Sequence, residues 1–312
     1  MKFLGTCLSA CMVLAAIPAQ AQQTHVLIIN GLAGEPQYRK AFHDVAQTLA
    51  DSARRRWGVA DSSLIILSEE YAAAPTALRA SSTKAEVGKA FLALSHRASP
   101  ADVLLVFLNG HGAGEGPQSR VNLPGPDPTA ADFSAWLAGF ARQTVVFANV
   151  ASGSGDFVPV LAGRGRIIVS ATKTSIERNE TIFAAPFVRG LTGTEADADK
   201  DGRVSVHEAF TFAKKEVARS YENDKKMLTE HAVLSDTTLA RTVGFGGPRG
   251  SRDPRIIALA GERQELEAQV AALRSRKATT DPATYERELE RLLLLVAEKS
   301  KAIRDASAGG KP

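Results

Sequence analysis

The sequence of 312 residues predicts an α/β fold, a three-layer sandwich with a mainly parallel sheet, followed by a C-terminal α-helical hairpin. The first observation behind this prediction is a series of short apolar runs that alternate with longer segments of helical periodicity. Such alternation requires crossover connections, so the strands run parallel and helices cover both faces of the sheet. The second observation is a change of pattern after residue 252, where apolar residues recur at spacings of three and four.

Residues 1–21 have the features of an export signal. Lys2 provides a positive charge, residues 8–17 form an apolar run, and residues 19–21 (AQA) are a small-x-small cleavage site. The run is shorter than the about 20 residues that a membrane-spanning helix needs. Residues 8–11 (LSAC) resemble a lipoprotein box only in part, because most of the apolar run follows them. We expect an exported protein, periplasmic or extracellular, with no membrane span.

The first half of the α/β domain, which we place at residues 22–243, contains two predicted strand-helix pairs. A strand at residues 26–30 (VLIIN) ends at a glycine, and residues 38–57 follow with helical periodicity and many Ala, Leu and Arg residues. A second strand is predicted at residues 64–67, and a second amphipathic helix at residues 84–96.

The second half continues the alternation. A third strand at residues 103–108 leads into a glycine-rich loop and a short extension at 120–123, after which prolines 124, 126 and 128 break the chain. A helix at 129–142, with Thr129 or Asp127 as its cap, precedes strands at 145–150 and 166–171. Further helices are predicted at 179–190 and 206–223.

The C-terminal part differs in composition from the domain before it. Residues 244–252 form a Gly/Pro/Arg linker, and residues 253–308 carry two helical patterns that Asp281-Pro282 separates. In the first pattern Arg263 interrupts the apolar spacing. These helices could pack on each other or on the α/β domain, or they could serve self-association as a coiled coil or docking to a partner.

Composition excludes several classes of function. The net charge of +4 and the aromatic content of 6% do not suit a nucleic-acid-binding protein. Both cysteines, Cys7 and Cys11, lie inside the predicted signal. A chain processed after residue 21 therefore has no thiol for a disulfide, a cysteine-ligated zinc ion or a cysteine nucleophile.

Two of the predicted strands end at side chains that could carry chemistry. Residues 103–116 (VLLVFLNGHGAGEG) place His111 between glycines, and residues 145–157 (VVFANVASGSGDF) place Ser152 in a loop of small residues. Functional sites of parallel α/β sheets lie beyond the carboxyl ends of the strands. The glycine-rich stretch lacks the Gly-Lys-Ser/Thr ending of a phosphate loop, so we interpret it as a turn that presents His111.

These two loops resemble those of caspase-like peptidases, the fold shared by caspases, metacaspases and legumain-type peptidases. In that family a His-Gly follows one strand, and an Ala-Cys-x-Ser-Gly element follows the next. Residues 170–183 (SATKTSIERNETIF) also resemble the segment that follows a later strand in bacterial caspase-like proteins. The resemblance implies peptidase ancestry and a peptide or protein partner, with His111 at the base position and Ser152 where the family has its cysteine. An alternative register would place Val150 at that position.

Because Ser152 stands where the family has its cysteine, several hypotheses for the function stay open. A serine hydroxyl needs a hydrogen-bonded base and usually a third group that orients the base, whereas a thiol is partly ionised near neutral pH. The chain is then either an exported peptidase-like hydrolase that uses Ser152 and His111, or an inactive caspase-like domain that binds peptides or partners and assembles through its C-terminal helices. A calcium-dependent structural protein of the envelope is the third hypothesis.

Residues 197–208 (DADKDGRVSVHE) carry the twelve-residue EF-hand calcium pattern. Gly202 permits the sharp turn, Val204 should pack inward, and residues 206–223 supply the outgoing helix. No second loop of this kind occurs in the sequence, and a structural role for Ca²⁺ is expected rather than sensing. The candidate metal ligands are Asp197, Asp199, Asp201, the carbonyl group of Arg203, Ser205 and Glu208.

Overall fold

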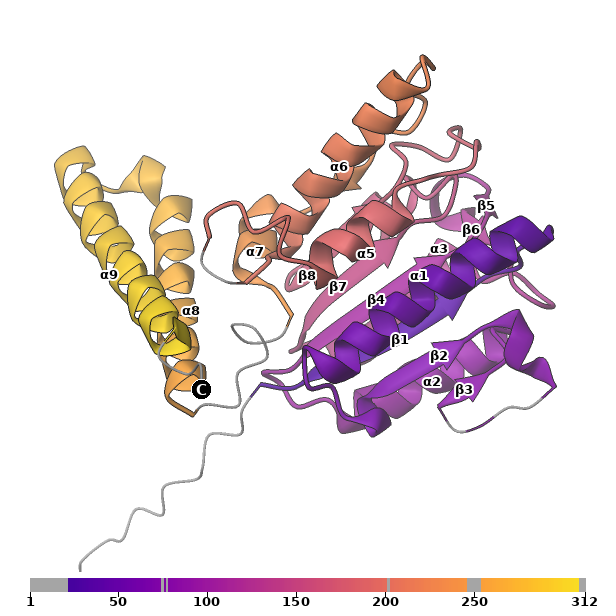
Figure 1. Cartoon of the computed structure of the whole chain (residues 1–312), viewed down its shortest axis with the longest axis horizontal. Helices are drawn as coiled ribbons and strands as arrows, with labels where there is room; N and C mark the ends of the chain where they lie inside the picture. Colours follow the sequence, from indigo (N-terminus) through magenta and orange to yellow (C-terminus); the bar gives the residue numbers. More distant parts are fainter. Residues whose placement is uncertain (1–21, 74–75, 77, 201–202, 246–253, 309–312) are drawn as a thin grey trace, which may run out of the picture.

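The computed structural model describes residues 22–73, 76, 78–200, 203–245 and 254–308. A seven-stranded sheet lies between two layers of helices, and two further helices follow at the C-terminal end (Figure 1). The predicted α/β sandwich with a mainly parallel sheet is therefore confirmed. The predicted signal at 1–21, most of the predicted linker and Asp201 lie outside the described residues.

The sheet has the strand order β3-β2-β1-β4-β7-β8-β9, and only β9 runs antiparallel to its neighbour. Its centre consists of β1, β4 and β7, whose residues are almost all buried. Two short strands outside this sheet, β5 (Gly112–Ala113) and β6 (Arg120–Val121), pair with each other. The strands of the main sheet are β1 (Thr24–Asn30), β2 (Leu64–Leu67), β3 (Arg79–Ala80), β4 (Val103–Asn109), β7 (Thr144–Asn149), β8 (Arg166–Ser170) and β9 (Val233–Leu234).

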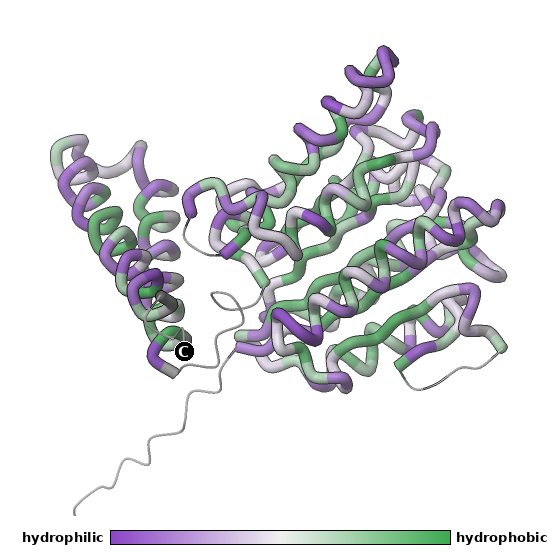
Figure 2. The backbone as a smooth tube through the Cα atoms, viewed as in Figure 1, coloured by the Kyte–Doolittle hydropathy of each residue, from purple (hydrophilic) through white to green (hydrophobic). Residues whose placement is uncertain are grey.

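Successive residues of each strand point to opposite faces, so each face of the sheet has its own core. Val26 and Ile28 pack with residues of α1, α5, α6 and α7, whereas Leu27 and Ile29 pack with residues of α2, α3 and α4. Figure 2 shows hydrophobic residues concentrated along the central strands. The helices are α1 (Pro36–Arg55), α2 (Lys84–Arg97), α3 (Ala130–Leu137), α4 (Phe157–Leu161), α5 (Ala184–Thr192), α6 (Val206–Asn223), α7 (Thr237–Thr242), α8 (Pro254–Ser275) and α9 (Pro282–Ala308).

Several elements differ from the sequence prediction. The helix predicted at 179–190 begins only at Ala184, because residues 171–183 form a loop against the Ser152 segment. The helix predicted at 129–142 ends as α3 at Leu137, with Thr129 as its cap as expected, and a 3₁₀ turn follows. Strands β3 and β9 have two residues each, which is too short for a recognisable periodicity.

The C-terminal helices α8 and α9 pack against each other and bury Val270, Leu273, Tyr285 and Leu292 together. Arg263, which interrupts the apolar spacing in the sequence, is only 2% exposed, and its Nε lies 3.4 Å from an Oε of Glu267. A buried arginine therefore replaces an apolar residue on this face of α8. None of the helices in the described part of the chain is long and apolar enough to cross a membrane.

Candidate functional site

The loops that carry His111 and Ser152 leave neighbouring strands. β4 and β7 pair in parallel with Leu108 opposite Asn149, so their carboxyl ends lie at the same edge of the sheet. The backbone N–H of Gly112 donates a hydrogen bond to the Ser152 Oγ at 3.3 Å. The structure thus brings together the two loops that the sequence singles out.

Ser152 lies in a tightly packed loop and is only 4% exposed. A Cβ atom on Gly112 would come within 2.7 Å of the Ser152 carbonyl oxygen, so only glycine at position 112 permits this approach. Gly153 has a φ of 62°, a backbone conformation that side chains disfavour. The two glycines therefore allow the loops to meet and leave the Ser152 hydroxyl little contact with solvent.

The imidazole of His111 packs against aromatic rings of α1. Its centroid lies 5.2 Å from that of Tyr38 and 5.4 Å from that of Phe42. A side-chain hydrogen bond with Glu180 raises the pKa of Tyr38 above its ordinary value. In the described part of the chain, no hydrogen bond joins this imidazole to the Ser152 hydroxyl. The arrangement lacks the contact through which a histidine activates a serine.

Two further polar residues of the Ser152 loop, Ser154 and Asp156, hold the loop in place through hydrogen bonds. The Oγ of Ser154 accepts hydrogen bonds from the backbone N–H groups of residues 171 and 172, at 3.1 and 3.3 Å. The carboxylate of Asp156 accepts one from Gly116 at 2.9 Å and one from Ser175 at 3.2 Å. Asp156 therefore ties together the loops after β4, β7 and β8, a role that its position in a small-residue loop did not reveal.

The loop at residues 171–183 forms the other side of the Ser152 segment. The N–H of Gly153 donates to the carbonyl of Glu177 at 2.9 Å. The hydroxyl of Thr181 donates to the carbonyl of Val150 at 2.7 Å. The position of Ser152 thus depends on a segment that the sequence predicted to be partly helical.

Glu230 holds the loop at residues 171–183 by hydrogen bonds. No sequence motif indicated this role for Glu230. Its carboxylate is buried and accepts hydrogen bonds from the backbone N–H groups of Ile182 and Phe183, both at 3.0 Å. Burial raises the pKa of Glu230 to about 7; the two N–H groups lower it, and the charges of Glu177 and Glu180 raise it further. The carboxyl group therefore changes its charge near neutral pH.

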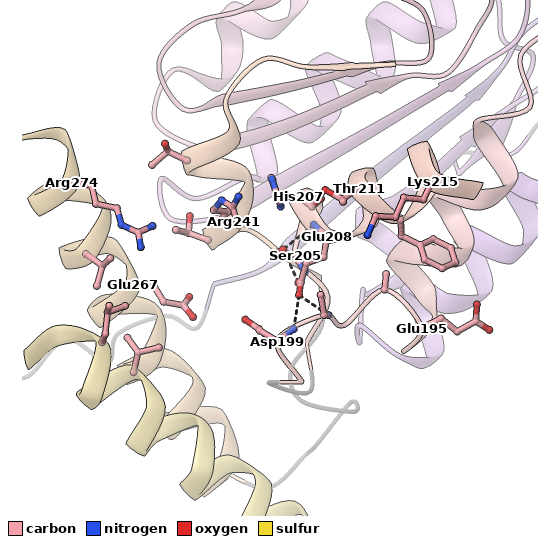
Figure 3. Close-up of a pocket in the computed structure, with 18 residues that line it drawn as sticks. Glu195, Asp199, Ser205, His207, Glu208, Thr211, Lys215, Arg241, Glu267 and Arg274 are labelled. Carbon is pink, nitrogen blue, oxygen red and sulfur yellow. Dashed lines mark hydrogen bonds between the residues drawn. The ribbon is translucent and has the colours of Figure 1, made fainter. Parts of the chain in front are cut away.

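A second cluster lies at the predicted calcium loop. Carboxylate oxygens of Asp197, Asp199 and Glu208 all lie within 4.8 Å of one another and could hold a metal ion. One oxygen of Glu208 accepts hydrogen bonds from the N–H groups of residues 198 and 199, at 3.0 and 3.4 Å (Figure 3). The other oxygen accepts from the N–H and hydroxyl of Ser205, each at 2.8 Å. The Oγ of Ser205 accepts a hydrogen bond from the N–H of Glu208 at 3.2 Å, which makes Ser205 the N-cap of α6.

The acidic loop at 197–208 pairs with the segment that follows α7. Val204 is buried as predicted, and Ser205 forms an isolated antiparallel bridge with Gly244. The N–H of Val206 donates to the carbonyl of Val243 at 2.8 Å, and the guanidinium of Arg203 donates to the carbonyl of Gly244 at 2.6 Å. In the absence of a second EF-hand sequence, this segment supplies a backbone partner for the loop.

A cavity of about 560 Å³ lies beside this loop, between the α/β domain and the C-terminal helices. Figure 3 shows Asp199 and Glu208 on one side and Glu267 of α8 on the other. Burial raises the pKa of Glu267, Arg263 and Arg203 lower it, and the charges of Asp199 and Glu208 raise it further. The sequence patterns did not associate α8 with the acidic loop. Cationic side chains also line the cavity, among them Arg241 and Arg274.

The donors of the loop fit a hard divalent cation. Ca²⁺ takes oxygen ligands, largely carboxylates and backbone carbonyls, and the three converging carboxylates provide such oxygens. When bound, the ion would supply positive charge to a group of carboxylates that otherwise repel one another. Asp197, Asp199 and Glu208 are the described acidic residues that would hold it.

The functional conclusion rests on the fold and these sites, because no protein-family model matches the sequence and no similar sequence is found among curated proteins. The mostly parallel seven-stranded sheet is compatible with a caspase-like fold.

Proposed function

We propose that the chain is an exported caspase-like domain that binds a peptide segment of a partner beside the Ser152 loop without cleaving it. The observation that carries this proposal is the state of Ser152. Its hydroxyl is buried and accepts a hydrogen bond from Gly112, while the imidazole of His111 packs against Tyr38 and Phe42. A serine in these surroundings is not activated as a nucleophile.

Exposed apolar side chains beside the site favour binding. Ile176 is 81% exposed and lies in the loop whose Glu177 carbonyl accepts the N–H of Gly153. Met227 is 85% exposed in the neighbouring loop, which an Asn179–Thr229 hydrogen bond of 3.2 Å joins to the first. Large exposed apolar groups on two linked loops favour contact with another molecule. A peptide with apolar side chains fits this surface.

A peptide library, applied to the chain from residue 22, tests binding and cleavage separately. We expect selected peptides to bind and to be recovered uncut. Ile176→Asp should weaken binding by about tenfold, the loss expected when a central apolar contact worth about 1.4 kcal/mol is removed. Leu92→Asp is the matched control. Leu92 is an exposed leucine of α2, a helix that packs with α3 and α4 and contributes no residue to the Ser152 loops. Equal losses in both variants would contradict the assigned surface.

Hydrolysis through Ser152 is the second candidate function, and one observation favours it. The N–H of Gly112 lies beside the Ser152 Oγ, and a backbone N–H at such a position could stabilise an oxyanion. Cleavage by the wild type that disappears in Ser152→Ala would establish this function and overturn the first. Cleavage by Ser152→Cys but not by the wild type would support a peptide-binding site in which the Ser152 hydroxyl of the wild type is inactive.

Calcium is the second part of the proposal. We infer that the loop at 197–208 binds Ca²⁺ and that the ion stabilises the fold. The convergence of Asp197, Asp199 and Glu208, together with the twelve-residue pattern, supports this assignment.

A further inference from the structure

We propose that the cation held by the loop at 197–208 fastens the C-terminal helical hairpin, α8 and α9, to the α/β domain through Glu267. This inference rests on the proposed calcium site and adds a function to it. The metal then acts between two parts of the chain and not only within one loop.

The first support is the position of Glu267. It lines the same cavity as Asp199, Ser205 and Glu208, and its side chain reaches into this space from α8 (Figure 3). The side chain is 22% exposed, so most of it is shielded from water. Asp199 on the opposite wall is exposed and Glu208 is half-buried, so their interaction with Glu267 is intermediate in strength between that of a buried pair and that of a surface pair.

The second support is the sign of the charges. Asp199 and Glu208 bring negative charge to one wall of the cavity, and Glu267 brings it to the other. Arg263, whose Nε lies 3.4 Å from an Oε of Glu267, offsets part of this negative charge, and without a cation the remaining repulsion from Asp199 and Glu208 opposes the approach of α8. A divalent ion held by the loop replaces that repulsion by attraction, because Glu267 then faces a bound positive charge.

The third support is the backbone that leads to the hairpin. Gly244 pairs with Ser205 of the loop, and the carbonyl of Val243 accepts the N–H of Val206. A Cβ atom on Gly244 would lie 2.5 Å from the carbonyl oxygen of Val204, so the two segments are in close contact. A metal ion in the loop therefore also stabilises residues 243 and 244, with which the loop pairs.

Spin-label distances test the proposal in the full chain from residue 22. That chain contains no cysteine, so Glu222→Cys on α6 and Glu298→Cys on α9 provide the only thiols, both at exposed positions. Double electron-electron resonance should give one narrow distance distribution with Ca²⁺ and a broader one with chelator. Glu267→Gln should lose the narrow distribution in Ca²⁺, whereas Glu265→Gln, an exposed residue of the same helix, should retain it.

Calorimetric titration of the same proteins with Ca²⁺ separates the two proposals. Calcium binding in Glu267→Gln without the narrow distribution supports the role of Glu267. Calcium binding by the wild type with an unchanged distance distribution, or a Glu267→Gln variant that behaves like the wild type, overturns the hairpin inference alone. No binding by the wild type overturns the calcium site and the inference with it.

Discussion

Ser152 and Ser154 lie two residues apart in one loop, yet their hydroxyl groups have different surroundings. Ser154 accepts hydrogen bonds from two backbone N–H groups after β8 and holds the loop in place. Ser152 accepts one, from Gly112, at the meeting point of two strand ends. The difference arises from the turn at Gly153, which directs the two side chains to different neighbours. Ser154 therefore joins the loop to the segment after β8, whereas Ser152 joins it to the segment after β4.

Glu230 gives a pH dependence at the residue scale. Its pKa is about 7 in the folded chain, above the ordinary value of 4.5, because the carboxyl group is buried. The folded state therefore holds a proton that the unfolded state releases between these two pH values. Stability falls as pH rises through this window, by at most about 3 kcal/mol for this group.

Urea unfolding at pH 5 and pH 7 measures this contribution. Glu230→Gln cannot ionise, so the loss of stability between the two pH values should be smaller in this variant than in the wild type. Glu222→Gln, at an exposed position of α6, should behave like the wild type. Identical pH dependence in wild type and Glu230→Gln would show that the carboxyl group does not titrate in this range.

At the scale of elements, the candidate site depends on three loops that cross at the carboxyl ends of β4, β7 and β8. Asp156 accepts hydrogen bonds from Gly116 of the first loop and Ser175 of the third. Gly155 lies so close to the third loop that a Cβ atom on it would be 2.2 Å from the carbonyl carbon of Lys173. The loops thus form a single packed unit.

Gly155→Ala should destabilise the chain by about 3 kcal/mol or more, because backbone atoms of residue 173 cannot move away without disrupting the crossing. Gly163→Ala is the control: its nearest contact would be the Arg166 side chain at 3.9 Å. Its effect should stay within about 1 kcal/mol. Chemical unfolding of both variants compares them, and equal effects would mean that the crossing is loosely packed.

At the scale of the whole molecule, the acidic loop at 197–208 lies where the α/β domain meets the C-terminal helices. It pairs with the segment after α7 and lines the cavity that α8 and α9 close. The hairpin has an apolar seam of its own, formed by Val270, Leu273, Tyr285 and Leu292. Where the hairpin faces the α/β domain, in contrast, the cavity between them is lined by several charged side chains.

Calcium should raise the thermal midpoint of the chain from residue 22. At a tenfold excess over Kd, ligand binding to the folded state adds about 1.4 kcal/mol of stability, which shifts the midpoint by a few degrees. Asp197→Ala should abolish the shift, and Asp224→Ala, at an exposed aspartate beyond the end of α6, should keep it. Melting curves of the wild type that coincide in calcium and in chelator would exclude the proposed site.

The sequence by itself determined the alternation of strands and helices, the apolar central strands and the positions of the two loops. It also predicted the acidic loop, whose carboxylates at positions 197, 199 and 208 converge as its pattern requires. These features are local, because they depend on periodicity and on the spacing of residues within one segment. The assignment of Ser152 as a nucleophile position follows from resemblance and stays a prediction.

Only the tertiary structure decided what surrounds these groups. Three arrangements join segments far apart in the sequence. His111 packs on α1, Glu230 accepts hydrogen bonds from residues 182 and 183, and Glu267 lies across the cavity from Asp199. Such contacts depend on how strands and helices stack, and no short pattern records them. Burial and neighbouring charge then set whether a hydroxyl is activated or a carboxyl group keeps its proton.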